Sequence, residues 1–137
     1  MSFEHLKRYE IRDRTAEMTL DVINGSPVLI LAPFTEQNRP LLAEILRMNK
    51  SSARTTLFNE KDIDKTTAYH KELCAKYVLR GWRNVFDSKG ASVLFSEEAA
   101  AEFLEALPNW LFTQIRLFAM ESSNFIDTEG EQELLGN

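Results

Sequence analysis

The pattern of apolar and polar residues is clearest in the N-terminal third of the chain, where it predicts a β-hairpin. Residues 19–23 and 28–31 are two short runs rich in Val, Ile and Leu. They are separated by Asn24-Gly25-Ser26-Pro27, residue types that tolerate the positive φ angles of a tight turn. Because a two-stranded hairpin is only marginally stable alone, we expect it to pack against helices or to pair with another strand.

A helix is predicted directly after this hairpin. Pro33 ends the second strand, and either Thr35 or Asn38 can cap the helix that follows. Pro40 falls in its first turn, where a missing N–H is harmless. Residues 49–60 are polar and rich in Ser and Thr, so they are interpreted as a loop. The apolar face of the helix consists of Leu41, Leu42, Ile45, Leu46 and Met48.

A longer helix is predicted to begin near Asp62 and to run past Lys71. Its last turn contains Gly81, which should loosen it. The residues that recur at three- and four-residue steps are Ile63, Thr67, His70, Cys74, Tyr77, Val78 and Trp82.

The C-terminal third predicts two further helices. Residues 87–90 form a turn signal, and residues 91–95 read as a short extended piece. Ser96 is a suitable N-cap, and its helix should end before Pro108, because the residue before a proline disfavours the α conformation. A final helix runs from Pro108 to about residue 122. The fold class is therefore α+β, mainly helical with a small N-terminal β-hairpin or sheet.

Length and charge divide the chain into three parts. A chain of 137 residues is about the length of one domain. Residues 1–15 form a charged arm, mobile or weakly helical, residues 16–126 a single compact domain, and residues 127–137 an acidic flexible tail. The net charge is −5, and the tail alone carries −4 from Asp127, Glu129, Glu131 and Glu133. The positive and negative charges of the rest of the chain nearly cancel, whereas nucleic-acid binding needs clustered Lys and Arg, so no nucleic-acid partner is expected.

Other features indicate a soluble cytoplasmic protein. The longest apolar run, residues 28–32, is far shorter than the roughly 20 residues that a membrane-spanning helix needs. We therefore expect no membrane partner. The first twenty residues alternate acids and bases and lack the apolar stretch of a secretion signal. A single cysteine, Cys74, fits a reducing compartment.

Candidate catalytic chemistry is sparse. His70 and Cys74 share one face of the predicted long helix, but a metal site would need at least one or two more ligands. A buried thiol beside an edge histidine is the favoured interpretation. The glycines occur singly rather than in a phosphate-binding loop. We expect neither enzymatic activity nor a metal or other cofactor.

The final helix is the unusual feature, because it is apolar over more than half of its circumference. Eight of the eleven residues from Trp110 to Met120 are apolar. Leu111, Ile115 and Phe118 form an ordinary core stripe, with further apolar residues on both flanks. Either the helix is covered by its own domain, or one flank meets a partner; both can hold together. The flanks contain Phe112 and Ala119 on one side and Trp110 and Leu117 on the other.

The segment from Leu79 to Phe125 contains a recognisable series of short motifs. They are Gly81-Trp82, Asp87, Gly90, Phe95-Ser96-Glu97, Pro108, Trp110-Leu111 and Asn124-Phe125. This series resembles the tail assembly chaperones of long-tailed, lambda-like bacteriophages, in which a Gly-Trp pair, an acidic-Gly turn and a Phe-Ser-Glu helix start precede a Pro-bounded aromatic helix that ends in Asn-Phe. The likeness covers about a third of the chain.

The resemblance implies a protein that binds the tape measure protein and keeps it soluble while the tail tube polymerises. It implies action in the host cytoplasm and absence from the mature virion. It also implies a longer form, made by ribosomal frameshifting, that recruits the tail tube protein; the last three residues are compatible with a slippery codon string. A homo-oligomer is a further option. The partner-binding residues are expected to be Trp110, Phe112, Leu117 and Met120, with Trp82 or Phe125 nearby.

Three other interpretations stay open from the sequence. The first is a structural tail or head–tail connector subunit, which would be retained in the virion. The second is an unrelated cytoplasmic adaptor. The last is an enzyme that uses Cys74 and His70.

Overall fold

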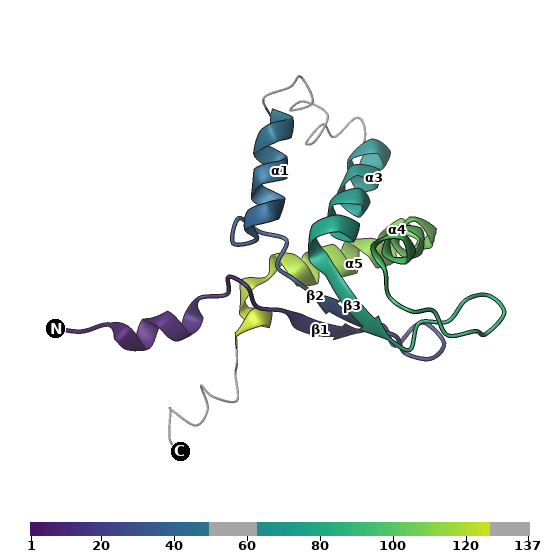
Figure 1. The fold of residues 1–137 in the computed structure, drawn as a ribbon, viewed down its shortest axis with the longest axis horizontal. Helices are drawn as coiled ribbons and strands as arrows, with labels where there is room; N and C mark the ends of the chain where they lie inside the picture. Colours follow the sequence, from purple (N-terminus) through teal and green to yellow (C-terminus); the bar gives the residue numbers. More distant parts are fainter. Residues whose placement is uncertain (50–62, 127–137) are drawn as a thin grey trace, which may run out of the picture.

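A three-stranded antiparallel sheet forms the base of the fold (Figure 1). The computed structural model describes residues 1–49 and 63–126. The strands are β1 (Ala16–Thr19), β2 (Val28–Leu31) and β3 (Leu79–Arg83), in the order β1-β2-β3. In the central strand, Leu29 and Leu31 are almost fully buried and belong to the main hydrophobic core. The α+β class is confirmed.

The predicted hairpin exists, but its first strand lies earlier in the chain than residues 19–23. β1 ends at Thr19, which pairs with Val28. The next residue, Leu20, donates its N–H to the carbonyl of Pro27 and buries its side chain, so residues 20–27 form the connection. Gly25 has the positive φ of +91° that the turn requires. The position of the second strand is confirmed.

The prediction of one long helix is wrong for its C-terminal part, which includes Gly81 and Trp82. Helix α3 spans Ile63–Leu73, a π-helical turn (η3) covers Cys74–Val78, and the chain then becomes strand β3. Gly81 lies opposite Ile30 in this strand, where an added Cβ would come within 3.3 Å of the Ile30 Cδ1. Pairing with β2 therefore overrides a sequence pattern that continues the helical spacing.

Helix α1 (Arg39–Asn49) is capped by Asn38, one of the two caps predicted. The Asn38 Oδ1 accepts a hydrogen bond from the N–H of Leu41 at 3.3 Å. The Nδ2 of the same buried side chain donates to the carbonyls of Pro33 at 2.9 Å and Tyr77 at 2.7 Å. Asn38 thus ties α1 to the segments that follow β2 and precede β3. The predicted loop overlaps α1 at residue 49, and its remainder, residues 50–60, lies outside the described residues.

The C-terminal elements follow the prediction closely. Helix α4 (Glu97–Ala106) is capped by the Ser96 Oγ, which accepts from the N–H of Ala99. Helix α5 (Asn109–Met120) follows Pro108, and a short 3₁₀ turn, η4, covers Ser122–Phe125. The turn at residues 87–90 is present, and residues 91–95 contribute only a single bridge, between Phe86 and Ser92.

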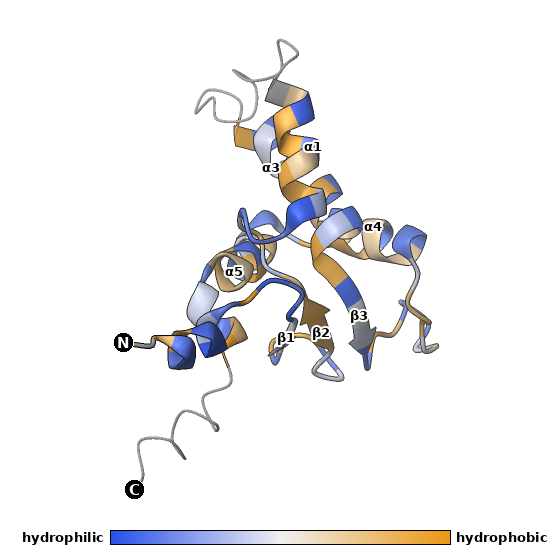
Figure 2. Ribbon diagram, turned by 60° about the vertical axis from the view of Figure 1, so that its left-hand side comes forward, coloured by the Kyte–Doolittle hydropathy of each residue, from blue (hydrophilic) through white to orange (hydrophobic). Residues whose placement is uncertain are grey.

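The core lies between the sheet and the helices. Figure 2 shows hydrophobic colouring along β2 and on parts of the helices. A short 3₁₀ helix, η1 (Glu4–Tyr9), extends away from the body in Figure 1. Within the described ranges, no helix has the length and apolar character needed to span a bilayer. The main core cluster includes Leu20, Leu29, Leu31, Leu41, Val78, Leu79, Leu104, Phe112 and Ile115.

Candidate partner-binding surface

Helix α5 packs one long side into the core. It starts after Pro108, whose carbonyl accepts hydrogen bonds from the N–H groups of Leu111 and Phe112. A proline in this place ends α4 and still lets a new helix begin. At the other end, the carbonyl of Ala119 accepts from the N–H of Phe34, which joins the helix to the segment after β2. Four α5 side chains are buried: Leu111, Phe112, Ile115 and Ala119.

The opposite side of α5 leaves three large apolar side chains in water. Trp110 is 57% exposed, Leu117 55% and Met120 43%. Trp110 and Leu117 are seven residues apart, which places them about 20° apart around the helix and roughly 10 Å apart along it. Met120 extends the same side toward the C-terminal end, where its sulfur lies 3.7 Å from the Arg116 guanidinium. We call these three residues the α5 surface stripe.

Trp82 packs against neighbouring residues of its own chain and is not part of the α5 surface stripe. It lies on β3 and is half-buried. Its indole N–H donates to the carbonyl of Val93 at 2.9 Å. Its ring meets Phe95 edge-on at 5.2 Å and Phe103 at 5.3 Å between centroids. Trp82 therefore holds the segment between β3 and α4 against the sheet, and this role accounts for its contacts.

Phe112 and Phe125 were expected at a partner surface, and the structure corrects both. Phe112 is fully buried, with the Lys71 ammonium 5.8 Å from its ring centroid, because α3 covers this flank of α5. Phe125 is 4% exposed, because the η4 turn folds its ring back toward Phe118. The Phe125 carbonyl also accepts a hydrogen bond from Arg14. The predicted residues that remain exposed are Trp110, Leu117 and Met120.

His70 and Cys74 form the buried thiol and edge histidine that the spacing favours. The His70 ring meets Phe34 at 5.4 Å between centroids, and burial, with a smaller contribution from Arg116, lowers its pKa to about 4. Cys74 is 1% exposed, and burial raises the pKa of its thiol far above the usual value. Among residues 1–49 and 63–126, no three His, Cys, Asp or Glu side chains are grouped to hold a metal ion.

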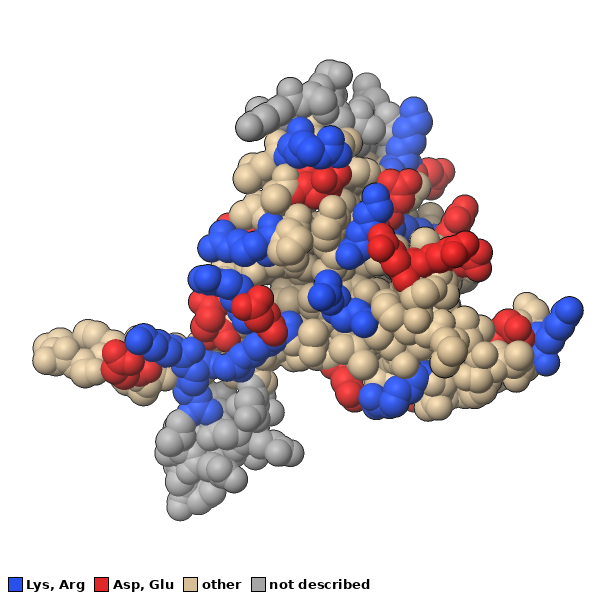
Figure 3. Space-filling model, in the orientation of Figure 1, with Lys and Arg blue, Asp and Glu red and all other residues tan. Residues whose placement is uncertain are grey.

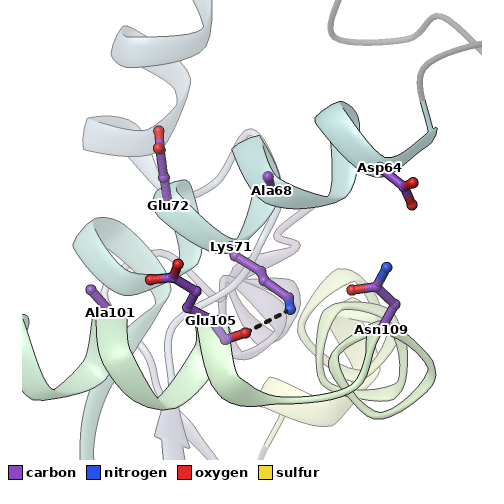
Figure 4. Close-up of a pocket in the computed structure, with 7 residues that line it drawn as sticks. All are labelled: Asp64, Ala68, Lys71, Glu72, Ala101, Glu105 and Asn109. Carbon is purple, nitrogen blue, oxygen red and sulfur yellow. Dashed lines mark hydrogen bonds between the residues drawn. The ribbon is translucent and has the colours of Figure 1, made fainter.

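A groove of about 370 Å³ lies where α3, α4 and the start of α5 meet (Figure 4). Lys71 reaches across it from α3 and donates to the carbonyl of Leu107 at 2.8 Å, with the carbonyl of Glu105 at 3.5 Å. Its ammonium thus satisfies the C-terminal end of α4, where a cation is favoured. Asp64 and Glu72 point in other directions in Figure 4. The lysine in this groove is engaged in a structural contact.

A second exposed apolar stripe lies on the arm, which was interpreted from the sequence only as mobile or weakly helical. Phe3, Leu6 and Tyr9 are 61%, 51% and 41% exposed. Side chains three residues apart eclipse one another in a 3₁₀ helix, so Leu6 and Tyr9 lie along one side of η1, and Phe3 is the residue that directly precedes it. The three-residue spacing was the available signal, and it indicates an amphipathic arm. The arm is anchored by Ile11, which is buried.

Comparison with known proteins gives a family for this arrangement. The family model of the YdaY prophage protein matches residues 33–137. The match begins just after β2 and includes α1, α3, β3, α4 and α5. Neither the curated proteins nor the solved structures contain a match. Because the match covers more than half of the chain, this phage-derived protein belongs to the YdaY prophage protein family.

Proposed function

We propose that this protein is a tail assembly chaperone that binds the tape measure protein and keeps it soluble during tail tube polymerisation. The observation that carries the proposal is the α5 surface stripe: Trp110, Leu117 and Met120 stay exposed although α5 also supplies core residues. The prophage family and the resemblance of residues 79–125 to tail assembly chaperones support it.

The chemistry of the stripe suits an apolar helix face. Tryptophan and methionine are enriched where proteins bind each other, and methionine adapts to irregular surfaces. The stripe is about 15 Å long, which matches nearly three turns of a partner helix with apolar residues at the same spacing. Such a surface can bind the apolar face of many amphipathic helices rather than one exact sequence. A holding chaperone for a long helical protein requires this tolerance.

The expected binding energy is modest. Complete burial of a large apolar side chain contributes about 1.5–3 kcal/mol, so covering the exposed halves of three such side chains contributes roughly 3 kcal/mol in total. Association itself costs at least about 4 kcal/mol. The stripe alone therefore does not offset the cost of association, so stable binding requires additional contact area or several linked copies of the chain along the partner. Weak individual contacts also allow tube subunits to displace the chaperone.

The proposed chaperone acts at a particular place and stage of phage assembly. It would work in the host cytoplasm during morphogenesis and be absent from the mature virion. A longer form, made by ribosomal frameshifting, would recruit the tail tube protein. The proposal assigns binding, and no catalysis, to this chain, so a Cys74→Ala variant should solubilise the partner as well as the wild type does.

Co-expression with the tape measure protein of the same prophage tests the proposal. The wild-type chain should move that protein from the pellet to the soluble fraction. Trp110→Gln with Leu117→Gln should lose most of this effect, because two half-exposed apolar side chains are worth about 2 kcal/mol, or roughly 30-fold in affinity. An equally insoluble tape measure protein with and without the wild-type chain would overturn the proposal.

A matched control removes the same kind of surface elsewhere. Val22 and Leu94 are 68% and 87% exposed and lie outside α5. Val22→Gln with Leu94→Gln should leave solubilisation unchanged. If this control loses activity as strongly as the α5 variant, the effect belongs to general surface hydrophobicity. Detection of the chain in purified phage particles would instead support the structural tail or connector subunit.

A further inference from the structure

A second pocket, separate from the Lys71 groove, has a strongly basic lining. It has a volume of about 280 Å³ and is formed by residues before β1, after β2, at the start of α1 and at β3. Three arginines line it, Arg14, Arg39 and Arg80, together with one carboxylate, Asp13. Figure 3 shows Lys and Arg side chains, with acidic ones among them, in the region between the base of α1 and the arm.

The residues that line this pocket carry an excess of positive charge. Three guanidinium groups against one carboxylate leave an excess of two positive charges. None of the three arginines takes part in the ion pairs found among residues 1–49 and 63–126. Arg14 donates to two backbone carbonyls instead, and Arg39 and Arg80 are exposed.

The start of helix α1 increases the positive potential. A helix carries a partial positive charge at its N-terminal end, which acidic residues in the first turn usually offset. The first turn of α1 contains no acidic residue and begins with Arg39. A carboxylate bound here would meet both the helix end and planar guanidinium groups that match its two oxygens.

The chain supplies such carboxylates at a suitable place. Arg14, which lines the pocket, donates to the carbonyl of Phe125 at 3.4 Å, so the described fold ends beside the pocket. The segment after it, residues 127–137, contains four acids and no base. At about 3.3 Å per extended residue, its first seven residues span more than 20 Å. A tethered ligand at this distance has an effective concentration on the order of millimolar.

We propose that the acidic segment 127–137 binds in the arginine pocket of its own chain. Carboxylates of the segment pair with Arg39 and Arg80, and the pocket is a recognition site for acidic peptide. This inference does not depend on the tape measure protein. The acidic segment therefore has a specific binding site, and its role is more than a general effect of its charge on solubility.

Paramagnetic relaxation in the full-length protein tests this proposal. A spin label on a Gln132→Cys variant reacts at the new cysteine, because Cys74 is buried. At low salt, the amide signals of Gln37 and Arg39 should lose at least half of their intensity. Near 0.5 M salt, where the screening length falls to about 4 Å, the intensity should return.

Two double variants separate the pocket from diffuse attraction. Arg39→Gln with Arg80→Gln should restore the signals at low salt. Lys65→Gln with Lys89→Gln removes the same charge at exposed positions outside the pocket and should leave the signal loss unchanged.

Three outcomes would overturn the proposal. The first is full intensity of the Gln37 and Arg39 signals at low salt in the labelled chain. The second is an equal effect of the two double variants. The third is signal loss only when labelled chain is mixed with isotope-labelled chain, which indicates binding between copies. All measurements use the chain alone, so their failure leaves the proposed chaperone function standing.

Discussion

Asn38 makes the most quantitative prediction, because three hydrogen bonds depend on one buried side chain. Its replacement by alanine removes the cap of α1, worth about 1 kcal/mol. It also leaves the carbonyls of Pro33 and Tyr77 without this donor, at about 1 kcal/mol each. The expected loss is therefore about 3 kcal/mol. With a urea m value of about 1.5 kcal/mol/M, the unfolding midpoint should fall by roughly 2 M.

Two further substitutions separate the cap from the bridge. Asn38→Asp keeps the capping oxygen and loses both donors, so it should still cost about 2 kcal/mol; a residue that acts only as a cap would lose nothing. Ser96→Ala removes one exposed cap bond of α4 and should cost only about 1 kcal/mol. Urea unfolding followed by circular dichroism measures all three. A loss below about 1 kcal/mol for Asn38→Ala would refute this reasoning.

Three other predictions concern stability and reactivity. In urea unfolding, Gly25→Ala should lower the free energy of unfolding by about 1–2 kcal/mol more than Gly90→Ala does. Both glycines have positive φ, but only at Gly25 would an added Cβ come close to another side chain, the Phe86 ring, at 2.9 Å. His70 has a folded pKa of about 4 against 6.5 in the unfolded chain, so the unfolded state binds the proton first and stability should fall as pH drops from about 6.5 to 4. Since the ring is partly exposed, the loss should be about 1–2 kcal/mol; a His70→Gln variant whose melting temperature shows the same pH dependence would contradict this cause. Cys74 should react with a thiol reagent only in denaturant, and rapid labelling of the native protein would show that its burial is not maintained.

Local signals in the sequence were sufficient for much of the fold. Ser96 and Pro108 set the limits of α4 and α5, and Asn38 set the start of α1, because capping and proline sterics act within a few residues. Strand β3 could not be predicted in this way. Its Trp82 continues the helical spacing of α3, and only pairing with β2, some fifty residues earlier, makes it a strand.

The candidate site shows the same limit. Helical periodicity places Phe112 and Trp110 on different flanks of α5, but it does not state which flank another element covers. Lys71 of α3 lies over Phe112, whereas no element among residues 1–49 and 63–126 covers Trp110 in this way, and Trp110 stays 57% exposed. The burial of Phe125 likewise depends on the η4 turn and on Arg14, more than a hundred residues earlier. Long-range packing therefore decides which apolar residues remain for a partner.

The indole N–H signals of the two tryptophans provide the most direct test of the central claim. Trp82 is hydrogen-bonded within the fold and serves as an internal reference, whereas Trp110 belongs to the α5 surface stripe. Titration with a soluble helical fragment of the tape measure protein should shift the Trp110 signal and leave the Trp82 signal in place. Binding of the fragment with no change at Trp110 would contradict the account.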